Sequence, residues 1–373
     1  MSTTTVSNPI RVGIVGVGNW AKYGHMPILK LLPEYRLSAI YSRSSDVAES
    51  SAAEYGFPHV AKTLDELVNH PEVDLVVVLT TAPQHEGAVR AAIAAGKDVF
   101  CEWPLTPSIA VSDELARLAD AAGVRTMVGL HRRLAPHNQY LGDLLKEDYV
   151  GKLRSVRLHV SMNLFQASLP AALAWTAPPQ NFSGMVALFA GHYLDMLFTA
   201  TGWPESISAL GVNQFPKVTI METGEVIETT NPDEFALIGS LPDGALVTAH
   251  FEAGKRSGAG VLIDIAGTEG DIRIVNNSAF GGAEDDYVMT GARGDQRPFT
   301  LLPVPDKYRD ARGAELSTTV SELAESYAAF ARDKAAGTST APTFGDAVRM
   351  HRLIEAAMES SRSGRRVAFG GAS

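Results

Sequence analysis

The chain has 373 residues, a formal net charge of -10 and a hydrophobic fraction of 45%. A single core stops growing near about 250 to 300 residues, so this length predicts two domains. The acidic balance argues against a nucleic-acid-binding surface, and no apolar run reaches the roughly 18 residues of a membrane span. Because Cys101 is the only cysteine, an internal disulfide and a thiolate metal cluster are excluded. We expect a cytoplasmic protein with no metal site and with neither nucleic-acid nor membrane partners.

Residues 1–10 contain neither the basic segment nor the apolar core of a signal peptide, and we predict that they form a disordered leader. Beyond them, apolar strands alternate with helical segments. Five strands are predicted at residues 11–18, 36–42, 73–81, 98–103 and 125–131. A helical pattern over 86–97 ends at Gly96, a residue suited to a helix C-terminus. This alternation is typical of an α/β Rossmann domain with a doubly wound parallel sheet, which we place at residues 11–130.

After residue 132 the strands become longer. They are predicted at residues 153–162, 206–215, 234–253 and 260–275, the last two being strand pairs joined by Pro-Asp-Gly and Thr-Glu-Gly turns. An apolar helix is predicted near residues 183–201, and two helices near 316–336 and 344–361 close the chain. We therefore predict a second, α+β domain over residues 131–373, built on an open, mostly antiparallel sheet.

The turn after the first strand carries a dinucleotide fingerprint, Gly16-x-Gly18-x-x-Ala21. The first glycine allows a tight turn, the second lets the backbone approach a pyrophosphate, and the small third residue lets the helix pack against the strand. The helix that follows offers its N-terminal N–H groups to the phosphates. Glycine-rich turns are common, but this one follows an apolar strand and precedes a second strand at the expected spacing. It predicts a nicotinamide dinucleotide site.

The end of the second strand decides between the two nicotinamide cofactors. Sites that prefer NAD place an acidic residue there to bind the ribose 2′-hydroxyl. Here the residues are Ser42, Arg43 and Ser44, and a guanidinium between two hydroxyls suits a 2′-phosphate. The alternative is a solvated surface arginine. We predict NADP, with NAD as the second choice.

Longer motifs resemble those of a known family. They are GVGNWAKYGHMPIL from Gly16, TTAPQHEGAVRAAIAAGKDVFCEWPL from Thr80, GLHRRLAPHNQYL from Gly129, GHYLDML from Gly191 and PTFGDAVRMHRLIEAAMESSRSGRRV from Pro342. Together they resemble the Gfo/Idh/MocA oxidoreductases along nearly the whole chain. The resemblance implies that the second domain binds a small-molecule substrate, that the reaction lies in a cleft between the domains, and that the outer sheet face forms a homodimer or homotetramer.

The resemblance also implies a set of cofactor-binding residues. They are Gly16, Gly18, Asn19 and Trp20 at the pyrophosphate, Thr80, Thr81, Pro83 and His85 beside the cofactor, and Glu102 and Arg133 near it.

Two departures from the family pattern concern catalysis. The family's Glu-Lys-Pro motif, whose lysine assists proton transfer, is Glu102-Trp103-Pro104 here. The family's second motif, Asp-x-Gly-x-His, keeps its histidine as His192, but Leu188 stands where the aspartate is expected. Removing a general base without a substitute typically costs about 100- to 10,000-fold in rate.

At both departures the sequence is similar to a narrower, Gal80-like branch of the family. The stretches that carry this likeness are FCEWPL and FAGHYLDML. The branch implies a second kind of function, a dinucleotide-binding regulator or sensor without catalysis. A metal hydrolase on an α/β scaffold has little support, because the ten histidines are scattered.

His192 is the best remaining acid–base candidate. Asp195 follows three residues later in the predicted helix, so the carboxylate could orient or charge the imidazole. The alternative is a core histidine bonded to a backbone carbonyl. Tyr23, His25 and His131 are further candidates for the cleft.

Trp103 has no ionisable group, so it acts through packing or its indole N–H. A flat ring beside the nicotinamide could stack on it and favour a planar or cationic substrate, such as an iminium that needs no proton donor. We expect an NADP-dependent oxidoreductase that transfers a hydride between nicotinamide and a small cyclic polar substrate, a sugar, polyol or oxo or imino derivative. The predicted catalytic residues are His192, Asp195 and Trp103.

Overall fold

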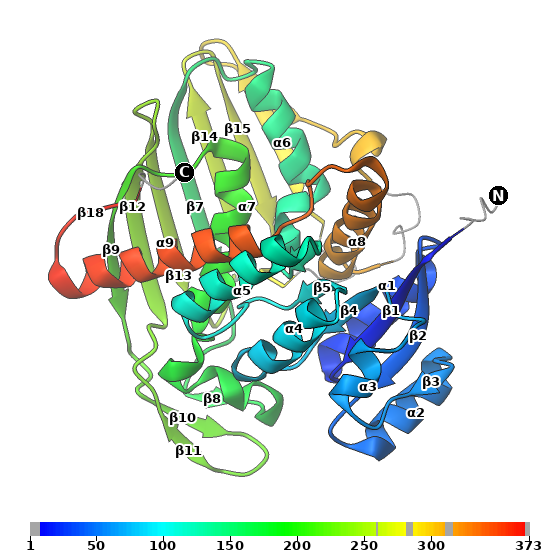
Figure 1. Cartoon of the computed structure of the whole chain (residues 1–373). Helices are drawn as coiled ribbons and strands as arrows, with labels where there is room; N and C mark the ends of the chain where they lie inside the picture. Colours follow the sequence, from blue (N-terminus) through cyan, green and yellow to red (C-terminus); the bar gives the residue numbers. More distant parts are fainter. Residues whose placement is uncertain (1–7, 259, 281–285, 310–315, 370–373) are drawn as a thin grey trace. The chain divides into compact units, whose positions relative to one another are not determined.

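The computed structural model describes residues 8–258, 260–280, 286–309 and 316–369 (Figure 1). The chain forms two compact units. The first comprises the chain as far as His131 together with Val320–Arg349, and the second contains most of the remainder. Residues 1–7 of the predicted leader lie outside the described residues, and the first strand begins at Ile10.

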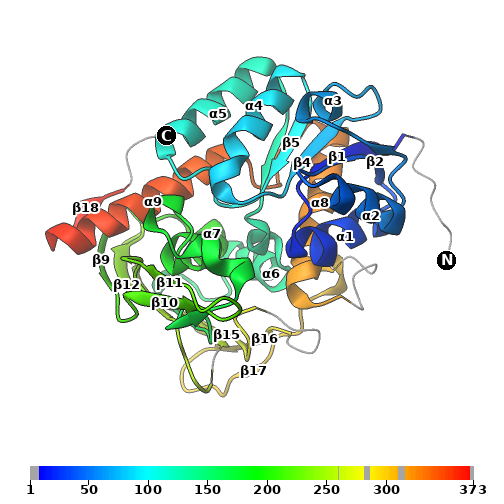
Figure 2. The same cartoon turned by 90° about the horizontal axis from the view of Figure 1, so that it is seen from below.

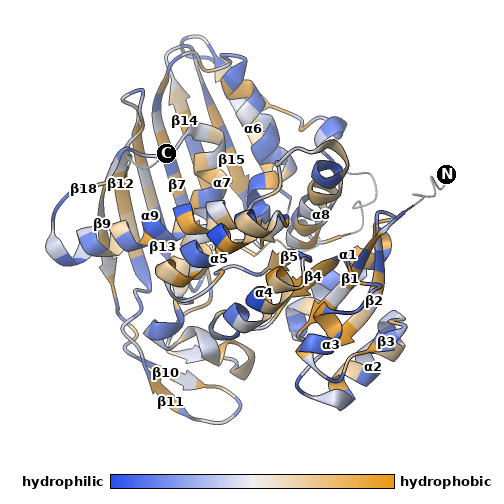
Figure 3. Ribbon diagram, viewed as in Figure 1, coloured by the Kyte–Doolittle hydropathy of each residue, from blue (hydrophilic) through white to orange (hydrophobic). Residues whose placement is uncertain are grey.

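The first unit is built on a six-stranded parallel sheet in the order β3-β2-β1-β4-β5-β6, which confirms the doubly wound prediction. Its strands are β1 (Ile10–Val15), β2 (Tyr35–Tyr41), β3 (His59–Val60), β4 (Leu75–Val78), β5 (Asp98–Cys101) and β6 (Thr126–Val128). Strand β3 was not predicted, because two residues are too short to show an apolar run. Figure 3 shows hydrophobic residues concentrated in the central strands, as expected for a sheet covered on both faces.

Helices cover both faces of this sheet. Figure 2 shows α3 (Leu64–Val68), α4 (His85–Ala94) and α5 (Ile109–Ala122) on one side, and α1 (Met26–Leu31), α2 (Ser45–Tyr55) and α8 (Thr318–Ala336) on the other. Gly96 follows α4 with φ +67°, in the predicted stop position.

The part of α8 from Val320 onward belongs to the first unit, although the prediction assigned it to the second domain. Tyr327 is fully buried, and its ring stacks on Phe100 of β5 at a centroid distance of 5.4 Å. The Tyr35 hydroxyl of β2 donates to the Tyr327 carbonyl oxygen at 2.6 Å. These partners lie more than 200 residues away in the sequence, so no local pattern could assign α8 to this sheet.

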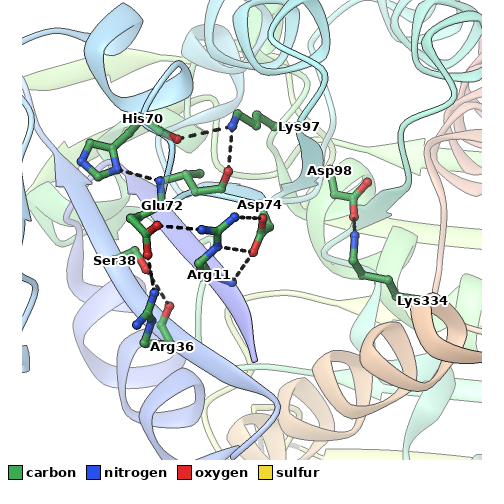
Figure 4. A network of polar contacts seen from close by, with 10 residues as sticks. Arg11, Arg36, Ser38, His70, Glu72, Asp74, Lys97, Asp98 and Lys334 are labelled. Atoms are coloured by element: carbon green, nitrogen blue, oxygen red, sulfur yellow. Dashed lines mark hydrogen bonds and ion pairs between the residues drawn. The ribbon is translucent and has the colours of Figure 1, made fainter. Parts of the chain in front are cut away.

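Polar side chains form hydrogen bonds and ion pairs at the amino ends of the central strands (Figure 4). The Arg11 guanidinium donates to both carboxylate oxygens of Asp74, at 2.8 and 2.7 Å, and to Glu72 at 2.9 Å. At the start of β5, Lys334 pairs with Asp98 at 2.6 Å. The Arg11 side-chain hydrogen bond lowers the pKa of Asp74. This network lies at the edge opposite to the carboxyl ends of the strands, where doubly wound sheets bind ligands, so we assign it to stability.

The second unit is built on a nine-stranded sheet in the order β17-β16-β15-β14-β7-β13-β12-β9-β18. Its strands are β7 (Leu153–Ser161), β9 (Ser206–Val212), β12 (Glu234–Ser240), β13 (Leu246–Glu252), β14 (Gly260–Gly267), β15 (Gly270–Asn276), β16 (Val288–Arg293), β17 (Thr300–Leu301) and β18 (Val367–Ala368). All neighbours pair antiparallel except β7 and β13, which confirms the predicted sheet type. A smaller sheet contains β8 (Ser168–Leu169), β10 (Lys217–Ile220) and β11 (Val226–Glu228).

The predicted turns join these strands. In the Pro-Asp-Gly turn, Gly244 has φ +82° and its N–H donates to the Leu241 carbonyl at 2.9 Å. Helices α6 (Pro136–Lys146) and α7 (Gly191–Thr201) lie on one face of the large sheet (Figure 1). The last helix, α9 (Phe344–Ser363), ends in this unit. The other sheet face exposes apolar side chains, including Ile238 at 53%.

None of the helices in the described parts of the chain combines the length and hydrophobicity needed to cross a membrane.

Two buried histidines predict acid sensitivity. Burial lowers the pKa of His137 to about 3 and that of His351 to about 4. Unfolded histidine titrates near about 6.5, so the unfolded chain binds more protons below that pH. The free energy of unfolding is therefore unaffected by these two groups above about pH 6.5. It decreases as the pH falls toward their pKa values in the folded state, by up to about 1.4 kcal/mol per pH unit for each group.

A His137→Gln variant is expected to show a shallower loss of stability between pH 6.5 and 4, measured as the free energy of unfolding in urea at several pH values. The matched control is His250→Gln, at an exposed position of β13. Equal slopes for the wild type and the His137 variant would contradict this assignment.

Candidate functional site

The turn after β1 has the conformation that a dinucleotide fingerprint requires. Gly16 has φ +94°, and its N–H donates to the Tyr41 carbonyl at 2.9 Å. A Cβ atom at Gly16 would lie 2.8 Å from Cγ2 and 3.1 Å from the backbone nitrogen of Thr80, at the end of β4. Gly16 therefore lets two neighbouring strand ends approach each other.

Gly18 is open where Gly16 is crowded. A Cβ atom there would meet no atom of the described part of the chain within 4 Å, apart from its chain neighbours, and the residue is exposed. Beside this turn, the buried hydroxyl oxygen of Thr80 makes no hydrogen bond to any described residue. An open approach to the backbone together with an unpaired buried hydroxyl is what a bound polar ligand would complete. These residues fit a dinucleotide.

The helix that follows contains a π-helical segment, η1 (Ala21–His25). Asn19 and Trp20 precede it, Asn19 being exposed and Trp20 partly buried. The Trp20 ring lies over Gly24, where a Cβ atom would be 2.9 Å from a ring carbon. Short π segments often occur at functional sites, and this one determines where His25 lies.

The predicted cofactor-selecting residues follow β2. Ser42 is partly buried, whereas Arg43 and Ser44 are exposed. The Ser44 N–H donates to the Ser42 hydroxyl at 3.4 Å, and α2 begins at Ser45. An arginine, two hydroxyls and the N-terminus of an 11-residue helix therefore lie together at the end of β2.

The segment after β4 contains Thr81 and Pro83, which are partly buried and exposed, respectively. His85 is 1% exposed, and its ring nitrogens face the carbonyls of Thr80 at 2.8 Å and Pro104 at 3.0 Å. Burial lowers its pKa. His85 therefore connects the end of β4 to the turn after β5, and its place beside the cofactor stays a prediction.

Glu102, directly after β5, is the centre of a buried polar cluster. Its Oε1 atom accepts hydrogen bonds from Trp20 Nε1 at 3.1 Å and from His25 Nε2 at 2.6 Å. The other ring nitrogen of His25 bonds to the Tyr327 hydroxyl at 2.7 Å, and His25 is fully buried. This series of hydrogen bonds connects the helix after β1, the end of β5 and α8.

The Glu102 carboxylate is held in its charged form. Burial raises its pKa, but the hydrogen bond from His25 and the electrostatic influence of the nearby histidine rings outweigh burial and leave the pKa below its ordinary value. The Glu102 side chain remains 15% exposed.

Two neighbours shape this turn. A Cβ atom at Gly129 would lie 2.5 Å from Glu102 Oε2 and 3.0 Å from the Trp103 nitrogen, so the close approach requires glycine. Trp103 is 3% exposed and precedes a cis peptide bond to Pro104. A ring buried to this extent packs closely against its neighbours, and its stacking on nicotinamide stays a prediction.

In the second unit, Arg133 and Asp195 form a buried ion pair. The guanidinium Nε donates to one carboxylate oxygen at 2.8 Å and Nη2 to the other at 2.5 Å. Their side chains are 9% and 0% exposed. The predictions gave Arg133 a place near the cofactor and Asp195 a place behind His192, whereas the structure makes each the other's bidentate partner.

His192 lies in the first turn of α7 and is partly buried. It follows a second π-helical segment, η6 (Val186–Ala190). Tyr193, the next residue, is fully buried, and its hydroxyl donates to the Ala279 carbonyl at 2.5 Å. Arg132 also donates to this carbonyl, at 3.0 Å. The loop before Phe280 is thus attached to the start of α7.

Three phenylalanines form an aromatic cluster in the second unit. Phe189 of η6 packs edge-to-face against Phe165 at 5.4 Å and against Phe280 at 4.9 Å between ring centroids. Phe280 is 40% exposed. Phe165 has φ +53°, a conformation that is costly for a bulky residue and is often found at functional sites. His192 lies one helical turn after Phe189.

The sequence did not indicate Tyr327, Gly129 or the phenylalanine cluster as parts of these sites. Gly129 could have been noted because it is a glycine directly after a strand, as Gly16 is after β1. Tyr327 has no such signal, because only folding brings it to His25. Within the described residues there is no group of three or more histidine, cysteine, aspartate or glutamate side chains that could hold a metal.

Comparisons with known proteins agree with this geometry. Residues 10–130 match the model of the oxidoreductase family with an NAD-binding Rossmann fold, Gfo/Idh/MocA, and residues 136–276 match that of the Gal80p C-terminal domain. The dehydrogenase aclE of Aspergillus oryzae is 30% identical over 63% of this chain and 68% of its own length.

This chain belongs to the Gfo/Idh/MocA oxidoreductase family. Another relative, the scyllo-inositol 2-dehydrogenase (NADP(+)) IolW of Bacillus subtilis, is 28% identical over 96% of this chain and 95% of its own. The crystal structure of a super-repressor mutant of Gal80p from Saccharomyces cerevisiae has the same fold, with a TM-score of 0.84 at 21% identity over 97% of this chain and 98% of that one. The family therefore includes dehydrogenases as well as a Gal80-like branch, to which this chain is related.

Proposed function

We propose that this member of the family is an NADP-dependent oxidoreductase that transfers a hydride between nicotinamide and a small cyclic polar substrate. The observation that carries the proposal is the open backbone at Gly18 beside the unpaired Thr80 hydroxyl. Both lie at the carboxyl edge of the parallel sheet, next to its switch point between β1 and β4, where doubly wound folds bind dinucleotides.

In this proposal the first unit holds the cofactor. Gly16, Gly18 and Asn19 would face the pyrophosphate, and Thr80 would supply a hydrogen bond. Arg43 between Ser42 and Ser44 would bind a 2′-phosphate with charge-assisted hydrogen bonds, which favours NADP over NAD. The nicotinamide would supply the redox chemistry when bound.

His192 would hold or release the proton of the substrate hydroxyl. Its imidazole is partly buried, and it lies on the helix that also carries Phe189. The cluster of Phe165, Phe189 and Phe280 offers aromatic surface to a ring-shaped substrate, since C–H faces of rings pack on aromatic side chains. The relative that acts on scyllo-inositol supports a cyclic polyol or its keto form.

The test is a screen of NADPH oxidation with cyclic ketones, keto sugars and cyclic imines, together with NADP reduction by the matching alcohols and amines. Both cofactors are titrated by isothermal calorimetry. We expect turnover on at least one cyclic substrate and tighter binding of NADP than of NAD. Tighter binding of NAD would overturn the cofactor assignment.

Replacing His192 by asparagine is expected to lower turnover at least tenfold, because positioned acid–base groups typically contribute about 100-fold or more. The affinity for NADP should stay nearly unchanged. His159→Asn, at a partly exposed position in β7, is the matched control. An unchanged rate in the His192 variant would remove this residue from the mechanism.

A second candidate is a dinucleotide-binding regulator or sensor without turnover. It is favoured by the match of residues 136–276 to the Gal80p C-terminal domain and by the buried tryptophan, Trp103, after Glu102. Cofactor binding without turnover on any substrate of the screen would favour this candidate.

We also propose a cytoplasmic homodimer or homotetramer that assembles through the outer face of the nine-stranded sheet. This face exposes Leu210, Ile238 and Leu246 at 50% or more, and exposed apolar patches commonly mark interfaces.

A further inference from the structure

Glu102 places a negative charge at the carboxyl end of β5. Within the described residues, its hydrogen-bond and ion-pair partners are Trp20 and His25, both through Oε1. Neither partner is an arginine or a lysine. The carboxylate therefore lies in a poorly solvated site without a permanently cationic partner, and its side chain is 15% exposed.

The position of β5 in the sheet tells which half of a dinucleotide would lie near this charge. In the order β3-β2-β1-β4-β5-β6, the fingerprint turn and the 2′-phosphate candidate Arg43 follow β1 and β2. The strands on the other side of the switch point, β4 to β6, form the second mononucleotide half. Glu102 belongs to the half that would receive the nicotinamide.

The two redox forms of nicotinamide differ in charge. The oxidised ring carries one positive charge, and the reduced ring carries none. A fixed carboxylate in a site of low dielectric interacts with the charged form much more strongly than it would in water.

We propose that Glu102 makes this protein bind the oxidised dinucleotide more tightly than the reduced one. The inference rests on the proposed dinucleotide function and concerns which form of the cofactor the site prefers. As a consequence, the bound reduced cofactor becomes a stronger hydride donor, so the site favours substrate reduction over oxidation.

The geometry around Glu102 supports a charge that stays in place. Gly129 leaves room for Oε2, and the bond to His25, itself bound to Tyr327, fixes Oε1. The effect of these neighbours on the carboxyl pKa keeps the group ionised at neutral pH.

The test compares dissociation constants of NADP⁺ and NADPH at pH 7.5, measured by isothermal calorimetry without substrate. In the wild type, the ratio of the NADPH constant to the NADP⁺ constant should exceed one. In Glu102→Gln, which keeps the shape of the side chain and removes its charge, the ratio should fall at least about tenfold, because a tenfold change corresponds to a charge pair as far apart as about 12 Å at an effective dielectric of about 20. Glu102→Asp should retain most of the ratio.

The matched control is Glu114→Gln, which removes a surface carboxylate of α5 that pairs with Arg90 at 2.8 Å. It should leave the ratio unchanged. Equal constants in the wild type, or a ratio that Glu102→Gln does not alter while both forms still bind, would overturn the inference and leave the proposed function intact. If the wild type bound neither form, the proposed function itself would fail. A wild-type ratio of one or less would overturn the inference even if Glu102→Gln does not fold, and Glu102→Asp then provides the second variant.

Discussion

A Gly18→Ala variant is expected to lose roughly tenfold or more in affinity for NADP while its thermal stability stays at the wild-type value. Among the described residues beyond its chain neighbours, none has an atom within 4 Å of the added Cβ atom, and Gly18 does not have a positive φ, so the folded state should accept alanine without strain. A methyl group there would instead occupy the space that the fingerprint keeps for the pyrophosphate. Calorimetric titration and a thermal unfolding scan measure the two effects.

Gly16→Ala is the contrasting variant. At φ +94°, with Thr80 atoms 2.8 and 3.1 Å from the new Cβ, alanine is strained by its backbone and by contact with the end of β4. We expect a loss of about 1–3 kcal/mol in the free energy of unfolding in addition to weaker cofactor binding. If Gly18→Ala bound NADP as well as the wild type does, the assignment of this turn to the pyrophosphate would be wrong.

Breaking the Arg133–Asp195 pair is expected to produce the largest loss of stability. Asp195 is fully buried and both its oxygens accept from the guanidinium, so Asp195→Asn leaves a buried charge without its counterion. Such changes cost about 3–5 kcal/mol. Urea unfolding of Asp195→Asn and Arg133→Met would measure this loss.

A double variant tests the explanation. Replacing both charges, as in Arg133→Met with Asp195→Leu, removes the unpaired charge, so the loss should be clearly smaller than the sum of the two single losses. Asp113→Asn, which breaks the exposed pair with Arg117 on α5, is the control and should change stability little. If Asp195→Asn were as stable as the wild type but catalytically impaired, Asp195 would instead act behind His192, as the sequence predicted.

The local patterns of the chain were sufficient for much of the fold. The apolar strands of residues 11–130, the stop at Gly96 and the Pro-Asp-Gly turn each depend on residues close together in the sequence, and each is found in the structure. Strand β3 was missed because two residues carry no periodicity.

In the candidate sites, too, some features could be predicted from the sequence and others could not. The fingerprint at Gly16 and Gly18 was visible because its function depends on backbone shape, which glycine spacing encodes. The environments of Glu102, Trp103 and Asp195 were not visible. Each is determined by partners far along the chain: His25 for Glu102, Gly129 for Trp103, and Arg133 for Asp195, which lies 62 residues away.

By itself, the sequence determined the two sheet types, the dinucleotide fingerprint and the family resemblance, since all three are encoded in short motifs and periodic patterns. The tertiary structure alone decided which carboxylates are available for chemistry. It shows Asp195 neutralised by Arg133 and Glu102 charged beside His25 and Trp20. The physical reason is that the charge and hydrogen bonding of a buried group depend on the atoms packed around it, and in this protein those atoms come from segments that only folding brings together.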